Sequence, residues 1–169
     1  MDITRKSIFC DGSFQNGKVV WGILVTDNDG NSLQTYRQEQ KSGSANVAEY
    51  LALVEALEFV RVNCRGEEID IYTDSETVIL QISGVRRCKS KRLLPLMNMV
   101  NTLRSEVKDN GTTVYIIKIN SSDNRAHDVV CSQPTMSDMD TMYDTMATHE
   151  EEYKEYMSNH DVNEWESEH

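Results

Sequence analysis

The sequence predicts an α/β fold in which a mixed five-stranded sheet is flanked by helices. Three strand-like segments come first without a helix between them, and helical spacing of apolar residues begins near residue 46. The later strand-like segments are separated by helical ones. Because tight turns join antiparallel strands and helical crossovers join parallel ones, we expect strands 1–3 to be antiparallel and strands 4–5 to run parallel to strand 1.

The N-terminal part of the chain predicts three strands that differ in polarity. An apolar run at 6–11 ends in Asp11, and the Gly-Ser pair that follows predicts that the chain turns away there. A second apolar run occupies 19–26, and the Asp-, Asn- and Gly-rich segment 27–31 is typical of a turn. Residues 33–40 are more polar, so this third strand is expected at the edge of the sheet.

From residue 46 the apolar residues recur at helical spacing, and the predicted helix extends to about residue 60. We expect Ser44 or Asn46 to cap it, and Glu49 to lie near its first turn, where the helix dipole favours a negative charge. The remaining elements are expected in this order: a strand at 69–74, a helix at 76–82 capped by Ser75, a helix at 94–107, a strand at 113–119, and a last helix that Ser122 or Asp123 caps and that ends before Pro134.

The net charge of −11 is distributed unevenly along the 169 residues. Residues 132–169 contain 11 of the 28 acidic residues and one of the 17 basic residues, so the preceding part is close to neutral. We therefore expect one folded domain at 1–133 and an acidic, Met-rich tail at 134–169 that is partly helical or disordered. Two interpretations of the tail stay open: it contacts the basic patch of its own chain, or it binds a protein partner.

Composition also limits where the protein is expected to work. No apolar run is long enough to cross a membrane, and the N-terminus shows no secretory pattern. The 4 cysteines are scattered without a CxxC pair, which disfavours zinc and redox motifs and favours free thiols. We expect a cytoplasmic, reducing location, a monomer, and no membrane partner.

Residues 86–92 form a strongly basic patch between two predicted helices. Five of these seven residues are basic: Arg86, Arg87, Lys89, Lys91 and Arg92. A solvated loop is the simplest interpretation, but the density of charge favours binding to a phosphate backbone.

Four acidic residues on separate elements are candidates for one site. Asp11 and Asp74 each end a predicted strand, so they project at the same end of the sheet if those strands are parallel neighbours. Glu49 begins the connecting helix, and Asp128 lies on the last helix, where Asp123 is a competing candidate. We expect the four side chains Asp11, Glu49, Asp74 and Asp128 to converge.

Such a group of acids requires a cation. Two carboxylates about 4 Å apart repel by roughly 4 kcal/mol at an effective dielectric constant near 20. Oxygen ligands without histidine or cysteine favour Mg²⁺ or Mn²⁺ over zinc. Two such ions can clamp a phosphodiester, one activating water and the other stabilising the leaving oxygen.

The motifs that carry these acids resemble those of the ribonuclease HI family, that is, ribonuclease H type 1. The four segments that match, within residues 6–133, are Asp11-Gly12-Ser13, Asn46-x-x-Glu49-Tyr50-x-Ala52-Leu53-x-x-Ala56-Leu57, Thr73-Asp74-Ser75 and Asn124-x-x-x-Asp128. Trp21-Gly22 also fits the pattern. The resemblance implies an RNase H-like fold and endonucleolytic cleavage of the RNA strand in an RNA–DNA hybrid, with 3′-hydroxyl and 5′-phosphate ends.

The resemblance further implies a role for each acid. Asp11 bridges two Mg²⁺ ions, which Mn²⁺ can replace, while Glu49 and Asp74 hold the ion on the leaving-group side. Asp128 helps to hold the ion that activates water. Glu49 also lies near an RNA 2′-hydroxyl, which is one way to distinguish RNA from DNA.

The same resemblance implies the substrate contacts. The basic patch 86–92 occupies the position of the basic handle that grips the DNA strand, and the remaining contact positions are Gly12, Ser13, Asn16, Ser44, Asn46 and Ser75.

The sequence departs from the family pattern in three places. The loop 14–18 is shorter than usual, Glu76 replaces a frequent glutamine, and Lys118 stands where many members carry a mobile histidine. His127 adjoins Asp128, but successive helix residues point about 100° apart, so it does not replace that histidine. A catalytically inactive hybrid- or RNA-binding module on the same fold is therefore the alternative to a nuclease.

Overall fold

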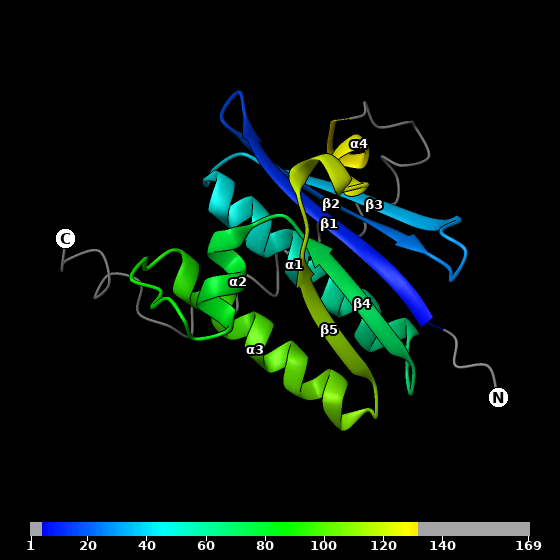
Figure 1. The fold of residues 1–169 in the computed structure, drawn as a ribbon. Helices are drawn as coiled ribbons and strands as arrows, with labels where there is room; N and C mark the ends of the chain where they lie inside the picture. Colours follow the sequence, from blue (N-terminus) through cyan, green and yellow to red (C-terminus); the bar gives the residue numbers. More distant parts are fainter. Residues whose placement is uncertain (1–4, 132–169) are drawn as a thin grey trace.

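One mixed sheet with helices on both faces organises the chain (Figure 1). The computed structural model describes residues 5–131, so the predicted domain boundary at 133 and the acidic tail lie outside the described residues. The elements in chain order are β1 (Arg5–Gln15), β2 (Lys18–Thr26), β3 (Ser32–Gln40), α1 (Ala45–Asn63), β4 (Glu68–Thr73), α2 (Glu76–Ile82), α3 (Leu93–Asp109), β5 (Thr113–Lys118), a 3₁₀ turn (Ser121–Asp123) and α4 (Ala126–Cys131).

The sheet has the predicted topology. Its strand order is β3-β2-β1-β4-β5, with β1–β2 and β2–β3 antiparallel and β1–β4 and β4–β5 parallel. The predicted fold class is therefore confirmed, including the place of the polar strand β3 at one edge. Because β1 is the central strand, it has an antiparallel neighbour on one side and a parallel neighbour on the other.

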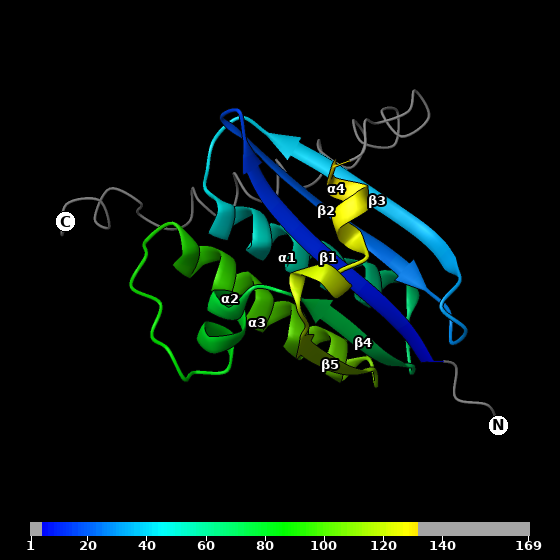
Figure 2. The ribbon, with the colours of Figure 1, turned by 45° about the horizontal axis from the view of Figure 1, so that its top comes forward.

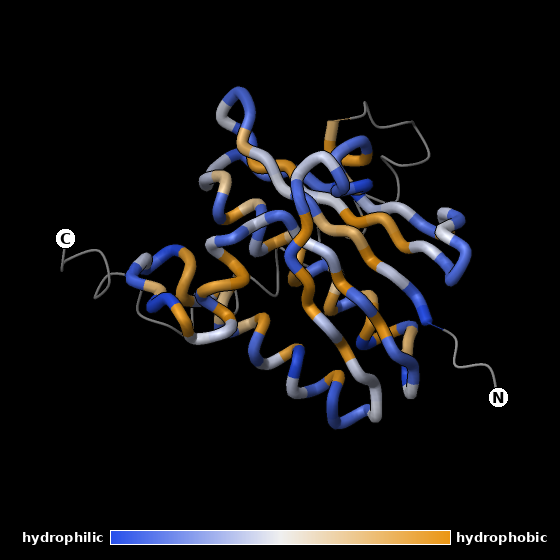
Figure 3. Tube along the Cα trace, viewed as in Figure 1, coloured by the Kyte–Doolittle hydropathy of each residue, from blue (hydrophilic) through white to orange (hydrophobic). Residues whose placement is uncertain are grey.

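Helices cover the two faces of this sheet unequally. Helix α1 packs against β1, β2 and β4 and is itself covered by α3, whereas α4 contacts β1, β2 and β3. Figures 1 and 2 show α4 on the face opposite to α1. Tyr50, Leu53 and Leu57 of α1 are fully buried against Ile8 and Ile71 of the central strands. Figure 3 shows this hydrophobic band along the strands, with hydrophilic residues at the turns.

Strand β1 is longer than the sequence predicts. The prediction that it ends at Asp11 is wrong, because β1 stays paired with β2 as far as Gln15 and Lys18. Asn16 and Gly17 form the two-residue turn of this hairpin, with φ of +53° and +74°. An Asn-Gly pair is a strong signal for such a turn, because both positions need positive φ. The short loop is thus a tight hairpin.

The structural role of Gly12 differs from the predicted one. It does not turn the chain away, since it and Ser13 remain inside β1. A Cβ atom at Gly12 would lie 2.3 Å from the carbonyl carbon of Ala48 and 2.6 Å from the backbone nitrogen of Glu49. Glycine therefore lets the first turns of α1 approach β1 closely, which brings Glu49 next to Asp11.

Two expectations from composition can be checked within residues 5–131. All four cysteines are free. No helix in this part of the chain is long and apolar enough to cross a membrane.

Replacing Gly12 by alanine tests the close approach of α1 to β1. Since the clashing atoms belong to backbone, we expect the free energy of unfolding to fall by about 3 kcal/mol, the upper end of the usual cost of overpacking. Urea-induced unfolding measures the change.

The neighbouring variant Ser13→Ala is the control. The Ser13 hydroxyl is buried without a hydrogen-bond partner among the described residues, so its removal is expected to change stability by less than about 0.5 kcal/mol. A loss below about 1 kcal/mol for Gly12→Ala would contradict the close contact.

Candidate active site

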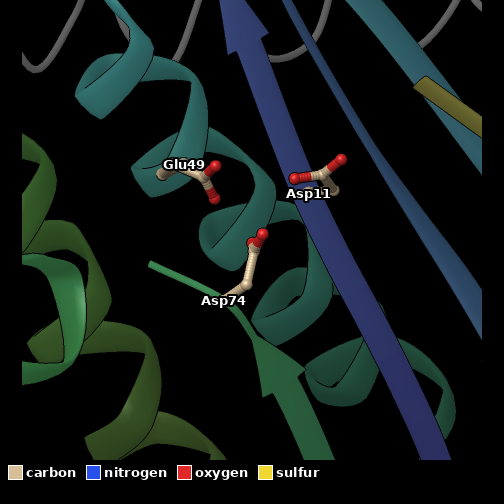
Figure 4. Close-up of side chains that lie close together, drawn as sticks. All are labelled: Asp11, Glu49 and Asp74. Atoms are coloured by element: carbon tan, nitrogen blue, oxygen red, sulfur yellow. The ribbon is translucent and has the colours of Figure 1, made fainter. Parts of the chain in front are cut away.

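Three carboxylates meet at the end of the central parallel strands. Ligand oxygens of Asp11, Glu49 and Asp74 all lie within 4.8 Å of one another. Figure 4 shows them coming from β1, α1 and the end of β4; one oxygen of Asp11 faces the other two side chains, and the other points away. The predicted convergence of these three acids is therefore observed.

Strand register explains why two of the acids face each other. The parallel pairing of β1 with β4 extends to Phe9 and Tyr72. Asp11 and Asp74 each follow two residues later, at equivalent positions on neighbouring strands. As β4 has ended there while β1 continues with β2, both side chains lie at the carboxyl end of the parallel pair, the usual place for a site in α/β folds.

Glu49 enters the cluster from the start of α1. Ser44 is the N-cap of α1, where its side chain accepts a hydrogen bond from the backbone N–H of Val47. The first turn of α1 contains no acidic residue, so Glu49 lies in the second turn. Glu49 therefore lies just beyond the first turn, near the predicted position, and the close approach at Gly12 brings it to Asp11.

Burial and mutual repulsion raise the pKa of two of the acids. Burial, followed by the charges of Asp11 and Asp74, raises the pKa of Glu49 to about 9. Burial and then Asp74 raise the pKa of Asp11 above its usual value, while a hydrogen bond from His127 opposes the rise. In the absence of a cation the cluster therefore tends to retain a proton.

The chemistry of this cluster fits a hard divalent cation. Glu49 Oε2 is buried and has no hydrogen-bond partner among the described residues. A buried carboxylate oxygen without a donor is costly, and the two neighbouring carboxylates increase that cost. Three oxygen donors match the preference of Mg²⁺ or Mn²⁺, so Asp11, Glu49 and Asp74 would hold such an ion.

Asn124 supports this arrangement, and its role was not predicted. Its buried amide nitrogen donates to the Cys10 carbonyl oxygen (2.9 Å) and to Asp74 Oδ1 (3.2 Å). Its side-chain oxygen accepts from the N–H of Ala126, where α4 begins. The prediction that Ser122 or Asp123 caps this helix is therefore wrong. In the sequence, Asn124 was only part of the motif that contains Asp128. Its hydrogen bonds could not be predicted, because they depend on the register of the sheet.

The last helix brings His127, rather than Asp128, against the cluster. His127 Nδ1 lies 3.3 Å from Asp11 Oδ2. Asp128 is exposed and is not part of the group of three acids. The expected convergence of Asp128 with the other three acids is therefore not observed, because the residue of α4 that faces β1 depends on how the helix is rotated on the sheet.

The predicted substrate-contact residues are spread over four places. Ser75 caps α2 beside Asp74, and Ser44 and the exposed Asn46 lie at the start of α1. Gly12 and Ser13 are within β1, next to Asp11. Asn16 is at the hairpin tip, roughly 16 Å along the strand from Asp11 at about 3.3 Å per residue.

The basic patch is a loop that connects α2 to α3. Arg86, Arg87, Lys89 and Arg92 are exposed, and Lys91 is half-buried. Within residues 5–131, those four exposed side chains form no ion pair with an acid. Their charge is therefore not neutralised by the described part of the chain.

Two of the departures from the family pattern also lie close to the acids. Glu76 is exposed in the first turn of α2, directly after the Ser75 cap. Lys118 pairs with Thr73 across the β4–β5 ladder, which places it one position from Asp74. A lysine thus stands beside the strand end that carries Asp74, at the position where the family often has histidine.

Comparison with known proteins agrees with this geometry. The RNase H family model matches residues 4–139. The chain belongs to the RNase H family, which makes it an enzyme of the ribonuclease H class and confirms the predicted family resemblance. No curated protein matches the chain.

Solved structures show the same fold at low sequence identity. The N-terminal RNase H domain of a Mycobacterium tuberculosis protein, solved as a fusion with maltose-binding protein, is 23% identical; the match covers 84% of this chain and 98% of that one, with a TM-score of 0.65. RNase H1 from the archaeon Halobacterium salinarum is 20% identical over 75% of this chain and 93% of that one, with a TM-score of 0.65.

A third structure is LC11-RNase H1, isolated from compost by a metagenomic approach and solved in complex with an RNA/DNA hybrid. It is 24% identical, and the match covers 74% of this chain and 92% of that chain, with a TM-score of 0.65.

The raised pKa of Glu49 predicts how stability depends on pH. A carboxyl group whose pKa is higher in the folded state destabilises the fold as pH rises from its unfolded pKa, about 4, towards its folded pKa. In EDTA, we expect the free energy of unfolding to fall between about pH 5 and pH 8, and Glu49→Gln to reduce that fall by at least about 1 kcal/mol.

Chemical unfolding at several pH values tests this prediction. Glu76→Gln is the control, because Glu76 is exposed and outside the cluster. Equal pH dependence of the free energy of unfolding in wild type and Glu49→Gln would contradict the proposed electrostatic cost of the cluster. Saturating Mg²⁺ is expected to stabilise wild type more than Glu49→Gln.

Proposed function

We propose that this protein is a metal-dependent endonuclease that hydrolyses the RNA strand of RNA–DNA hybrids and leaves 3′-hydroxyl and 5′-phosphate ends. The observation that carries the proposal is the group of Asp11, Glu49 and Asp74, in which a buried Glu49 oxygen has no partner among the described residues. Membership of the RNase H family supports the reaction class, and the complex of LC11-RNase H1 with a hybrid supports the substrate.

The acids of the chain are proposed to bind two Mg²⁺ ions when substrate is present, with Mn²⁺ as a substitute. Asp11 is the shared ligand, Glu49 and Asp74 complete one ion site, and Asp128 contributes to the other. When bound, divalent cations supply Lewis-acid chemistry, which activates water and neutralises charge on the phosphodiester. The low polarity around Asp11 and Glu49 strengthens these interactions because burial reduces screening.

Other side chains of the chain hold and position the hybrid. Arg86, Arg87, Lys89 and Arg92 carry charge that the described part of the chain does not neutralise. The basic loop 86–92 is therefore proposed to bind backbone phosphates of the DNA strand. Glu49 is proposed to lie near an RNA 2′-hydroxyl, which distinguishes RNA from DNA. Gly12, Ser13, Ser44, Asn46 and Ser75 lie on the elements that carry the acids, and they are the remaining candidate contacts. Asn16 lies farthest from the acids along β1, so it is proposed to contact the hybrid away from the cleavage point.

A non-catalytic hybrid-binding module is the second candidate. Glu76 favours it, because this exposed acid at the start of α2 repels phosphate beside the cluster. The three clustered acids favour the nuclease, since binding alone gives no reason to bury mutually repelling carboxylates. Incubation of labelled RNA–DNA hybrid, double-stranded RNA and double-stranded DNA with Mg²⁺ or Mn²⁺ separates the two candidates.

Asp74→Asn is expected to abolish hybrid cleavage while the protein stays folded. The substitution is nearly isosteric and keeps an oxygen that can accept the hydrogen bond from Asn124, but it removes the charge that holds a cation. We expect the rate to fall by at least about 100-fold in the hybrid assay. An unchanged rate would exclude the proposed mechanism.

Asp128→Asn and Asp123→Asn form a matched pair on neighbouring exposed acids. If Asp128 is the fourth ligand, its variant loses at least about tenfold in rate, whereas Asp123→Asn keeps wild-type activity. The opposite result would assign the fourth position to Asp123.

Charge removal in the basic loop is expected to weaken hybrid binding and its dependence on salt. Each phosphate contact contributes about one unit to the slope of log affinity against log salt, so Arg86→Gln with Arg87→Gln is expected to lower the slope by about two. Arg104→Gln is the control, because Arg104 is an exposed arginine of α3 outside the loop. A wild-type slope in the double variant would show that the loop does not bind phosphates.

A further inference from the structure

His127 connects the acid cluster to a thiol on the same helix. Its Nδ1 lies 3.3 Å from Asp11 Oδ2, and its Nε2 lies 3.6 Å from the sulfur of Cys131, one helical turn later. Both His127 and Cys131 are exposed, whereas Asp11 is buried. The imidazole therefore links a buried carboxylate to a thiol that solutes can reach.

The contact with Asp11 determines which imidazole nitrogen is available. An ionised carboxylate only accepts hydrogen bonds, so a neutral His127 carries its proton on Nδ1 and donates it to Asp11. The lone pair of Nε2 then faces Cys131. Metal-binding histidines commonly have this arrangement, in which a carboxylate orients the ring and increases the basicity of the other nitrogen.

The distance between nitrogen and sulfur also fits a shared metal ion. Zinc binds imidazole nitrogen at about 2.0–2.1 Å and thiolate sulfur at about 2.3 Å, so two such ligands at a tetrahedral angle lie about 3.5 Å apart. The observed separation of Nε2 and Sγ is 3.6 Å. Residues four apart on a helix share a face, so α4 itself holds the two ligands at this spacing.

We propose that His127 and Cys131 bind a soft divalent cation such as Zn²⁺ or Cd²⁺, at a site separate from the oxygen-ligand cluster. Nitrogen and sulfur select these ions over Mg²⁺, whereas the three carboxylates make the opposite selection. Binding forms a metal–sulfur bond and releases the thiol proton to the buffer. Water fills the remaining coordination positions, so the site is open and exchangeable.

The two sites are coupled, because Asp11 belongs to the acid cluster and also contacts His127. An ion on His127 and Cys131 fixes the hydrogen bond from Nδ1 to one Asp11 oxygen, and it adds positive charge beside the cluster. Both effects oppose a second cation on Asp11, Glu49 and Asp74. By linkage, a hard cation on the acids weakens soft-cation binding by the same factor. This coupling rests on the cation site of the proposed function, whereas binding to His127 and Cys131 does not.

Titration of the reduced full-length chain with CdCl₂ tests the new site. The readout is the ultraviolet charge-transfer absorption of a cadmium–thiolate bond, which is independent of nuclease activity. We expect a saturable band in wild type, its loss in Cys131→Ser, and an affinity at least about tenfold lower in His127→Ala. Cys88→Ser is the matched control, because Cys88 is half-buried in the basic loop. This variant is expected to keep the wild-type band.

Two results would overturn the site. If Cys131→Ser keeps the band, another thiol binds the ion; if His127→Ala binds with wild-type affinity, the histidine is not a ligand. Circular dichroism of each variant verifies that the fold is retained.

A second matched pair tests the role of Asp11. Asp11→Ala and Asp74→Ala each remove one charge of the cluster, but only Asp11 contacts His127. We expect Asp11→Ala to weaken cadmium binding by about 10–100-fold and Asp74→Ala to weaken it much less. Equal losses would show that Asp11 acts only through charge, and the proposed orienting contact would be wrong.

Competition measures the coupling. Millimolar Mg²⁺ is expected to reduce the cadmium affinity of wild type but not of Asp11→Ala. If wild-type cadmium affinity does not respond to Mg²⁺ while the band behaves as expected, the coupling fails and the site stands.

Discussion

Three carboxylates held within 4.8 Å of one another are the constraint on which the rest of the site depends. Each repels the others, and burial raises the pKa of Asp11 and Glu49 further. The three side chains stay together because the surrounding elements fix the positions of their backbone. The register of β1 and β4 fixes two of the acids, and the contact of α1 with Gly12 fixes the third. A bound cation would offset the repulsion among the carboxylates. The cluster therefore lowers the stability of the cation-free protein and raises its affinity for a cation.

The surroundings of the cluster hold it without neutralising it. Asn124 donates to Asp74 and to the backbone of β1, so it fixes the position of one acid and the start of α4 together. His127 supplies a hydrogen bond to Asp11 Oδ2. In the described residues, the exposed basic loop lies on the connection between α2 and α3. The acids are therefore arranged for a cation, and the loop is proposed to bind a polyanion.

Much of this could be predicted from the sequence, for identifiable reasons. Apolar spacing distinguished strands from helices, and turn residues separated them, so the strand directions and the mixed sheet followed. Asp11, Glu49 and Asp74 were found because each was predicted at the end of a strand or near the start of a helix, within motifs that resemble those of the family. The hairpin of β1 was missed although Asn16-Gly17 signals it, because Gly12-Ser13 was taken for the end of the strand.

The sequence by itself determined which chemistry is present: oxygen ligands in a mixed α/β sheet, a concentrated basic loop, and an acidic C-terminal segment. Only the tertiary structure decided which side chains meet. Asp128 and His127 are adjacent in the chain, and the rotation of α4 on the sheet brings the histidine to Asp11. The sequence predicted Gly12 as a turn residue, but in the structure α1 packs closely against it. Local patterns encode elements, whereas contacts between elements depend on register and packing, which no single segment contains.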